Sequence, residues 1–404
     1  MLRISRFSLY TLLVFSPLAR AGNQPWAVTI IHMVTLVGLT ALLLEKNIQR
    51  NRIWIKTPLD GPIAGLLALC SISTLVSSHR PTSFWALVQV FNYVAVYYLV
   101  VHAITTRSQL RRFVHGIIAI GLFLSVFGLV KYLGLNPFAW WDYTGNNSPS
   151  PSSTFGNSNH YAGYLNMVIP LALAFLGTGM RGKSVFLILV VNFVLLAGLM
   201  FSLSRGGWVS AWLSLAGMFV LFGSCFEFRR KKLYYLTGFG MLVFALLALS
   251  SLNVVLELRS IRQFQDDGSL ISRIVVWKGV WTMILDHPLT GVGPGTFSTM
   301  FTRYQPPGYL MRFFYAHSDY LQFVSAVGLP LIPVMLWAAV LFLRHGFRKL
   351  RDPSRLIRAI TLAGLTGVLA NLIHMAIDFN LHMPANALLF TVIIALVMAP
   401  VPRN

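Results

Sequence analysis

Long apolar runs without charged residues, separated by short basic stretches, dominate this sequence. There are about twelve such runs, and most approach the roughly 20 residues that a helix needs to cross the hydrocarbon core of a bilayer. Of the 404 residues, only 11% are charged and 56% are hydrophobic, and the mean hydropathy is +0.69. A soluble domain carries about 25% charged residues, and a surface with so few charges would aggregate in water. The sequence therefore predicts an all-α integral membrane protein with about 12 transmembrane helices.

The ends of the apolar runs give the expected spans. The first run follows Arg3 and Arg6 and ends near Ala19-Arg20-Ala21, so it could also be a cleavable signal peptide. We keep it as the first helix, because the spans expected in the rest of the chain are counted most consistently when this segment is retained. We expect spans near residues 6–20, 26–44, 60–77, 84–104, 113–131, 161–178, 185–203, 206–224, 233–252, 320–343, 359–377 and 383–400.

The basic residues predict the orientation of these spans. Cytoplasmic loops carry an excess of Lys and Arg. With the N-terminus in the cytoplasm, about two thirds of the 32 Lys and Arg residues fall in cytoplasmic loops, so we expect both termini there. The net charge of +21 could also suggest a nucleic-acid partner. Because the basic residues occur in short runs between apolar stretches, we expect the lipid bilayer as partner and no nucleic acid.

The chain has the pattern of a single polytopic membrane domain over residues 1–404, with two long loops on the outer face. The longer loop, residues 253–318, lies between the ninth and tenth predicted helices, and we expect it to carry part of the active site. The other, near residues 132–160, is rich in Asn, Ser, Pro and Gly. Loops of this length are usually functional or disordered.

The interiors of the predicted spans contain no Asp, Glu, Lys or Arg. Ion-coupled transporters and pumps usually place such groups at mid-membrane. Their absence counts against a transporter or flippase of a lipid-linked solute, which stays the alternative from another functional class. A non-enzymatic scaffold is a further alternative.

Two arginines on the outer face are candidates for binding phosphate. Arg205 lies between two spans in the sequence Ser202–Trp208, where small neighbours leave its guanidinium accessible. Arg273 opens a helix-like apolar stretch in the long loop. The planar fork of Arg suits two phosphate oxygens, although an interfacial Arg can simply snorkel. The later glycines at 291, 293 and 295 have the wrong spacing for a nucleotide site and predict a tight turn.

Histidine and aspartate side chains also gather at the outer helix ends. His317 could act as a general base, and the nearby Asp319 could orient its ring or favour the start of a helix. His374 and Asp378 share one face if their helix continues. His160 caps another outer helix end. Each of these side chains also fits a purely structural role.

Few residues suit a metal. Asp266-Asp267 is the only acidic pair in the outer loops, whereas metal-dependent glycosyl transfer needs clustered carboxylates. The two cysteines, Cys70 and Cys225, lie far apart in apolar surroundings. We therefore expect no metal and no other cofactor.

Several of these motifs together resemble the bacterial O-antigen ligase family. Its superfamily also contains O-antigen polymerases and protein O-oligosaccharyltransferases. The resemblance is strongest from Ser202 to Pro384, and the N-terminal third contributes only a hydropathy pattern. It rests on Ser204–Trp208, on Arg273 followed by Asp286–Gly295, on His317-Ser318 with Gly328 after nine further positions, and on His374 with Asp378-Phe379.

The resemblance implies an inverting, metal-independent transfer of a glycan from undecaprenyl diphosphate to an acceptor hydroxyl. In ligases the acceptor is lipid A–core. It implies a periplasmic active site on the bacterial inner membrane. The family's essential residues match Arg205, Arg273 and His317, with His317 as general base. We expect His160, Asp319, His374 and Asp378 to help bind the substrates.

Two departures bear on the choice within the superfamily. The last position of the ligase signature usually holds a small residue or Tyr, and here it is Leu331, so a polymerase stays open. No large domain follows the last predicted span, so a protein-glycosylating member is less expected.

Overall fold

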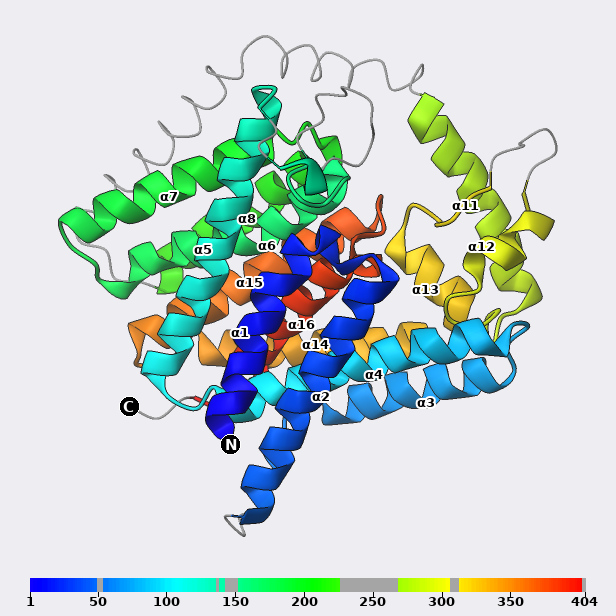
Figure 1. Cartoon of the computed structure of the whole chain (residues 1–404), viewed down its shortest axis with the longest axis horizontal. Helices are drawn as coiled ribbons and strands as arrows, with labels where there is room; N and C mark the ends of the chain where they lie inside the picture. The colour runs from blue at the N-terminus through cyan, green and yellow to red at the C-terminus, as the bar shows by residue number, and fades with distance from the viewer. Residues whose placement is uncertain (49–53, 136–137, 142–151, 226–267, 306–311, 402–404) are drawn as a thin grey trace.

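The computed structural model describes residues 1–48, 54–135, 138–141, 152–225, 268–305 and 312–401, and all their regular structure is helical (Figure 1). This confirms the predicted all-α fold. Five short 3-10 helices accompany the α-helices: η1 (Arg20–Gly22), η2 (Ala139–Trp141), η3 (Phe175–Thr178), η4 (Phe301–Arg303) and η5 (Asn380–His382). The α-helices are α1 (Leu2–Leu18), α2 (Pro25–Ile48), α3 (Asp60–Leu75), α4 (Arg80–Ala103), α5 (Arg107–Tyr132), α6 (Ser158–Ala174), α7 (Lys183–Met200), α8 (Arg205–Cys225), α11 (Gly268–Asp286), α12 (Phe297–Met300), α13 (Asp319–Val327), α14 (Leu331–Lys349), α15 (Arg355–Met375) and α16 (Pro384–Met398).

Within the described ranges, eight helices are long and apolar enough to cross a membrane: α2, α4, α5, α6 with η3, α7, α8, α14 and α15. Two shorter apolar helices, α3 and α16, add to them. The chain is therefore a multi-pass membrane protein, as the sequence predicts. The 17-residue α1 falls on the expected first span. The span expected at 233–252 and the pair Asp266-Asp267 lie outside the described residues.

The prediction of one span over 320–343 is wrong, because two helices share that stretch. Helix α13 ends at Val327, and Gly328 adopts a positive φ of 97°. A Cβ on Gly328 would lie 2.5 Å from the carbonyl oxygen of Leu289, and Leu329 N donates to Pro288 O at 2.7 Å. Helix α14 begins only at Leu331. The apolar run is continuous in sequence, so hydropathy alone conceals this break.

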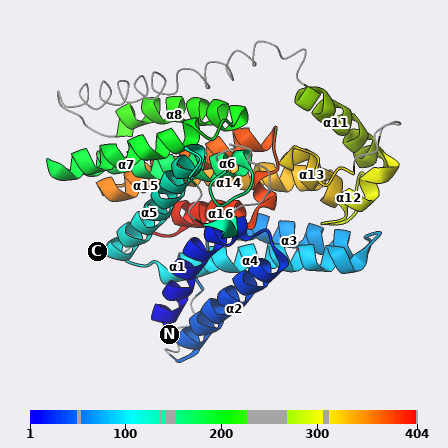
Figure 2. The ribbon, with the colours of Figure 1, turned by 45° about the horizontal axis from the view of Figure 1, so that its top comes forward.

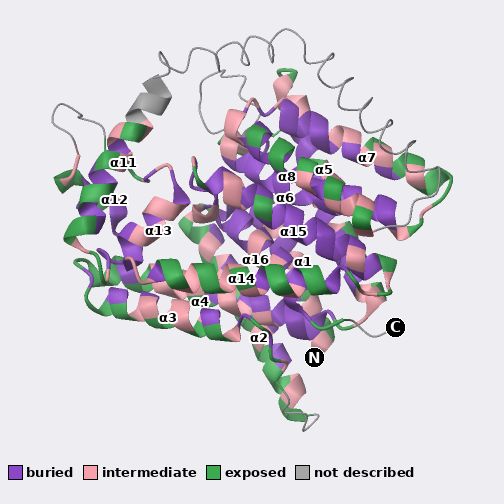
Figure 3. Ribbon diagram, turned by 180° about the vertical axis from the view of Figure 1, so that it is seen from behind, coloured by how far each residue is buried: buried purple, intermediate pink, exposed green. Residues whose placement is uncertain are grey.

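Many of the helices form three layers, which Figure 2 shows one above another: α7 and α8, then α6, α15 and α16, then α1, α2 and α4. Helix α5 runs across the layers and contacts α7, α6 and α1. Helices α6 and α15 contain the largest buried share of any candidate span, 94% and 78% of their most apolar windows. They form the purple interior of Figure 3. Lipid-facing side chains therefore come from the outer layers, whereas α6 and α15 are enclosed by protein.

Helices α11, α12 and α13 form a smaller group at one edge of the bundle (Figure 1). The expected turn at the glycines joins α11 to α13: Val292 N donates to Ser325 O and Gly293 N to Ala326 O, both at 3.0 Å. The Oγ of Ser73 on α3 also donates to Ala326 O, at 2.8 Å. This group has its own apolar core, made of Val276, Val280, Met283, Ile284, Val292, Phe297, Met300, Phe301, Phe313 and Ala316.

Helices α8 and α15 run antiparallel and have equal length. Each has 21 residues, or about 30 Å at 1.5 Å per residue, which equals the thickness of the hydrocarbon core. At one end Gly206 meets His374, and at the other Cys225 lies near Arg358. These two ends therefore lie at opposite faces of the bilayer.

A buried lysine closes the end of α16. Lys349, the last residue of α14, is 8% exposed. Its Nζ donates to the carbonyl oxygens of Leu396, Val397 and Ala399 at 3.3, 2.8 and 2.7 Å. The last carbonyls of a helix have no partner within the helix, and a cation at this end is also favoured by the helix dipole.

We expect Lys349→Met to lower the stability of the folded protein by about 2–3 kcal/mol, because buried carbonyls lose a charged donor. The measurement is the midpoint of thermal unfolding in detergent. Arg348→Met, at the exposed neighbouring position, is the control and should leave the midpoint unchanged. Equal midpoints for the two variants would contradict a stabilising role for this lysine.

Candidate active site

The first turn of α8 carries Arg205 and is capped by the serine before it. Ser204 Oγ accepts from Gly207 N at 3.1 Å and donates to Asn159 Oδ1 on α6 at 2.7 Å. Leu203, in the turn between α7 and α8, has a positive φ of 58°. Arg205 is the first residue of α8 and is half-buried. Its position therefore follows from a side-chain cap that also ties α8 to the start of α6.

Two glycines let α8 approach its neighbours closely. A Cβ on Gly206 would lie 2.7 Å from Ile377 Cδ1 and 3.2 Å from His374 Nε2. A Cβ on Gly207 would lie 2.6 Å from the Cβ of Ala162 on α6. Such small residues let helix backbones pack tightly in membranes. The residue after Arg205 is thus in contact with the imidazole of His374.

His160 lies in the first turn of α6 and is almost completely buried. Its Nδ1 is 3.3 Å from Asn380 Oδ1, and its carbonyl oxygen accepts from Asn386 Nδ2 at 3.0 Å. The ring of Phe379 meets the His160 ring edge-on, with centroids 4.7 Å apart. His160 therefore joins α6 to the segment between α15 and α16.

His317 lies in the segment between the α11–α12 group and α13. It has a positive φ of 52°, a conformation that is uncommon for a residue other than Gly and is often found at functional sites. On its N-terminal side, Ala316 O accepts from Trp277 Nε1 at 2.9 Å, and Ala316 N donates to Gln322 Oε1 at 2.6 Å. These bonds to α11 and α13 hold the backbone of His317 in place.

Asp319 is fully buried, and it does not orient His317 as one sequence interpretation suggested. One carboxylate oxygen accepts from Leu381 N at 2.9 Å, and the other lies 2.6 Å from His382 Nδ1. Asp319 N donates to Asp378 O at 3.0 Å. The start of α13 is thereby fastened to the connection between α15 and α16. Asp319 instead hydrogen-bonds His382, a residue that was not among the predicted site residues.

His374 and Asp378 do not share a helix face, because α15 ends at Met375. Residues 376 and 377 form a turn, and the chain bends at Asp378. Both side chains are buried, and Asp378 Oδ1 accepts from Phe379 N at 2.8 Å. Asp378 Oδ2 and His374 Nδ1 are buried and make no hydrogen bond within the described residues. Such atoms are rare in folded proteins.

Phe379 lies at the centre of this group. Tyr315 stacks on its ring with centroids 4.1 Å apart, and His317 meets it edge-on at 5.3 Å. With His160 on the same ring, three segments distant in sequence meet at one aromatic side chain. The Tyr315 ring also contacts His382, with centroids 5.4 Å apart.

The electrostatic surroundings of His317 favour its neutral form. Burial lowers the pKa of the His317 imidazole most, and the positive charge of Arg273 on α11 lowers it further. Asp378 opposes these effects by raising the pKa, and His160 adds a smaller lowering effect. A neutral imidazole can accept a proton. Arg273 is also close enough for its charge to act on His374.

The structure thus brings together most of the side chains that the sequence singled out. His160, His317, His374, Asp378 and Arg273 form one cluster. Arg205 begins the helix whose next residue touches His374. Asp319 contributes through its bonds to the α15–α16 connection. Phe379, Asn380 and His382 were missed as site residues, because their partners are more than 60 positions away in sequence.

One segment of the chain matches a known protein family. Residues 189–336 match the O-antigen ligase family model. The match confirms the resemblance found in the sequence and includes Arg205, Arg273 and His317. It supports an O-antigen ligase-like or polymerase-like function, that of a membrane glycosyltransferase. No curated protein matches the chain.

The fold explains the spacing of the O-antigen ligase signature. Ser318 precedes α13 as its N-cap, the nine positions that follow are the nine residues of α13, and Gly328 is its C-cap. Gly328 is required because its φ is positive and the Leu289 carbonyl leaves no room for a side chain. Leu331, which departs from the signature, is buried against α3 at the start of α14.

We expect Gly207→Ala to destabilise the folded protein by about 1–3 kcal/mol, because its new Cβ meets the Cβ of Ala162, an atom that cannot rotate away. Gly217→Ala is the matched control, since it lies on the same helix and a Cβ there meets nothing within 4 Å. Thermal unfolding in detergent compares the two. If both alanines unfold at the wild-type temperature, the close approach of α8 to α6 is not needed for stability.

Proposed function

We propose that this protein transfers a glycan from undecaprenyl diphosphate to an acceptor hydroxyl, with inversion and without a metal or another cofactor. The observation that carries the proposal is the proximity of the Arg273 guanidinium to a half-buried His317 whose pKa is lowered. Both residues lie inside the segment that matches the O-antigen ligase family. The pairing supplies a cation for a diphosphate and a neutral base for a hydroxyl.

The proposed reaction is a single displacement at the anomeric carbon of the donor. His317 accepts the proton of the acceptor hydroxyl as the oxygen bonds to that carbon. The bond from the carbon to the diphosphate oxygen breaks, and undecaprenyl diphosphate leaves as an anion. Arg273 and Arg205 stabilise the negative charge that develops on the leaving oxygen.

The neighbouring residues would bind and position the substrates. Asp378 and His374 would help bind the substrates: Asp378 Oδ2 and His374 Nδ1 have no hydrogen-bond partner within the described residues, so a hydroxyl that reached them would supply one. His160 would help to hold these binding residues in place through its contacts with Phe379 and Asn380. Asp319 is a positioning residue, because it fastens the start of α13, next to His317, to the α15–α16 connection.

We further propose the topology and the acceptor. The site would face the periplasm from the bacterial inner membrane, with both termini cytoplasmic, and the segment 253–318 would be a periplasmic loop of one polytopic domain. Lipid A–core is the proposed acceptor, as in ligases. Polymerisation onto a second lipid-linked glycan is the alternative, because it uses the same leaving group.

Purified protein incubated with lipid-linked glycan and candidate acceptors, without metal or nucleotide, tests the reaction. We expect His317→Ala and Arg273→Ala to lose about 10²–10⁴-fold in rate. Arg205→Lys should recover only part of the activity lost in Arg205→Ala, because Lys keeps the charge and loses the fork. Arg303→Gln, at an exposed position in η4, is the control.

Two outcomes would count against the proposal. Wild-type transfer by folded His317→Ala would exclude this residue as the base. Movement of lipid-linked glycan across reconstituted vesicles that lack any acceptor would instead favour a flippase. Product length separates the remaining two: single transfers to lipid A–core indicate a ligase, and extended repeats indicate a polymerase.

The pH dependence tests the surroundings of His317. A base must be deprotonated, so activity should fall only below the ordinary pKa range of His. Asp378 raises the His317 pKa, so residual activity of Asp378→Asn should persist to lower pH. Arg273 lowers it, so Arg273→Gln should lose activity at higher pH than wild type. Rate profiles between about pH 4 and 8 measure both shifts; identical acid limbs in all three proteins would refute His317 as the titrating base.

A further inference from the structure

A hydrogen-bonded pair of an aspartate and a histidine lies in the candidate active site. Asp319 Oδ1 is 2.6 Å from His382 Nδ1. The aspartate side chain is completely buried, whereas 23% of the histidine side chain is exposed. A neutral imidazole donates its Nδ1 proton to such a carboxylate, which fixes both the tautomer and the orientation of the ring. The second ring nitrogen, Nε2, is then a hydrogen-bond acceptor.

Aromatic rings hold the His382 imidazole but leave Nε2 open. Phe323 on α13 stacks on it, with centroids 5.2 Å apart and an interplanar angle of 19°, and Tyr315 meets it edge-on at 5.4 Å. Within the described residues, Nε2 has no hydrogen-bond partner, and it is not one of the buried unpaired atoms. His382 therefore presents an oriented acceptor that is accessible from solvent.

The attachment of α13 to the α15–α16 connection does not require this imidazole. Asp319 N donates to Asp378 O at 3.0 Å, and the second carboxylate oxygen of Asp319 accepts from Leu381 N at 2.9 Å. These two bonds already join the segments. The bond to His382 adds an imidazole that is fixed at one nitrogen and open at the other. This is the arrangement by which an aspartate orients a histidine toward a substrate hydroxyl.

Two aromatic rings connect His382 to the proposed base. The Tyr315 ring that contacts His382 also stacks on Phe379, with centroids 4.1 Å apart, and Phe379 contacts the ring of His317 at 5.3 Å. The two imidazoles are therefore close enough for a few sugar residues of one glycan to reach both.

The chemistry of His382 suits a hydroxyl and does not suit the diphosphate. Phosphate oxygens without protons only accept hydrogen bonds, so they cannot pair with an acceptor nitrogen. The buried carboxylate of Asp319 beside the ring also disfavours an anion. The positive charge of Arg273 acts on His317, and in the proposed function it is Arg273 that holds the diphosphate of the donor.

We infer that His382 Nε2 accepts a hydrogen bond from a hydroxyl of the acceptor glycan and thereby directs the reacting hydroxyl of that glycan to His317. Asp319 positions the His382 imidazole. The inference rests on the proposed function, since the acceptor is the substrate named there. The donor is anchored by arginines at its diphosphate, whereas the acceptor needs a second contact to fix the direction of its reacting hydroxyl.

Two substitutions separate binding at Nε2 from the bond at Nδ1. The amide nitrogen of Asn can take the place of Nδ1, so H382N keeps the bond to Asp319 and loses the acceptor. The longer Gln side chain can place its amide oxygen near the position of Nε2, so H382Q keeps an acceptor and loses that bond. In the transfer assay we expect H382N to raise the KM for lipid A–core about three- to tenfold. H382Q should raise it less, and the KM for the lipid-linked donor should stay unchanged in both.

H79N is the control for these variants. His79 is exposed and caps α4, and Asn also caps helices well, so its acceptor KM should equal that of the wild type. A larger rise in H382Q than in H382N would show that only the bond to Asp319 matters and would overturn the inference. An unchanged acceptor KM in both variants, or an equal rise in the donor KM, would do the same. In each of these results the wild type still transfers glycan, so the proposed function stands.

Modification by diethyl pyrocarbonate gives a second readout, on the unaltered protein and without transfer. The reagent acylates accessible imidazole nitrogens, and mass spectrometry of the peptide that contains His382 measures the rate. Lipid A–core, or a lipid-linked glycan if that is the acceptor, should slow this modification several-fold, and undecaprenyl diphosphate should not. Absence of protection by both glycans, or equal protection by undecaprenyl diphosphate, which carries no sugar, would overturn the inference even if the variants failed to fold or the protein transferred nothing.

Discussion

The hydrogen bond from Asp319 N to Asp378 O joins the two segments on which the candidate site depends. The carboxylate of Asp319 reinforces it with bonds to Leu381 N and the His382 ring. Because Asp319 is completely buried, these bonds are shielded from water and their loss would leave unpaired polar groups. The start of α13, and with it His317, is thereby fixed against the connection between α15 and α16.

The rest of the site follows from helix ends. In lipid, backbone polar groups must be satisfied within a helix, so irregular backbone occurs where it is enclosed by protein. The turn before α8, the start of α6, the segment before α13 and the connection after α15 are four such places. Phe379 packs at their meeting point, with His160, His317 and Tyr315 around its ring. Charged and polar groups can therefore gather there without entering the apolar layers.

The two ends of α8 and α15 are chemically different. One end combines histidines with acids and an arginine in a buried cluster. The other combines three arginines with an apolar wall around a cavity. Since the helices are about as long as the hydrocarbon core is thick, both sets of groups are at the depth of lipid headgroups, in opposite leaflets. A single pair of helices thus carries a histidine-rich cluster at one end and an arginine-rich one at the other.

Hydropathy and a few motifs were enough to predict the all-α membrane fold, most of its helices and three candidate site residues. Most apolar runs became the expected helices, since a helix is the only way for one segment to satisfy its backbone in lipid. Arg205, Arg273 and His317 could also be selected from the sequence, because their neighbours form recognisable motifs. The structure differs from these predictions where a helix ends inside an apolar run. Gly328 interrupts the expected tenth span, and α15 ends at Met375, before Asp378.

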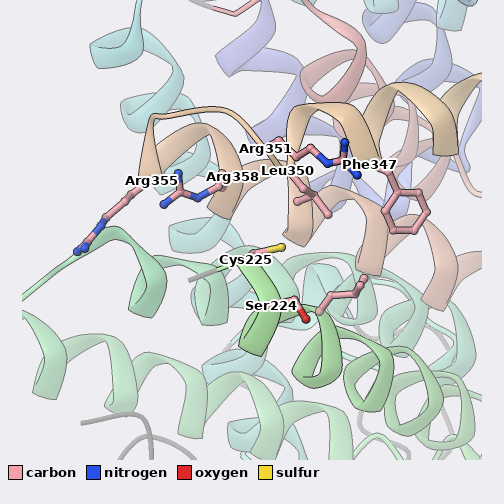
Figure 4. Close-up of a pocket in the computed structure, with 8 residues that line it drawn as sticks. Ser224, Cys225, Phe347, Leu350, Arg351, Arg355 and Arg358 are labelled. Carbon is pink, nitrogen blue, oxygen red and sulfur yellow. The ribbon is translucent and has the colours of Figure 1, made fainter. Parts of the chain in front are cut away.

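Only the tertiary structure decided which side chains meet. The partners of Asp319, His160 and Gly206 come from other helices, and periodicity within one segment carries no information about such contacts. The cavity beside Cys225 likewise exists only because α8 and α14 end, and α15 begins, at the same place (Figure 4). Local sequence thus sets which segments enter lipid, through their free energy of burial. The close packing of helices sets the site, because contact depends on positions that the chain reaches only when folded.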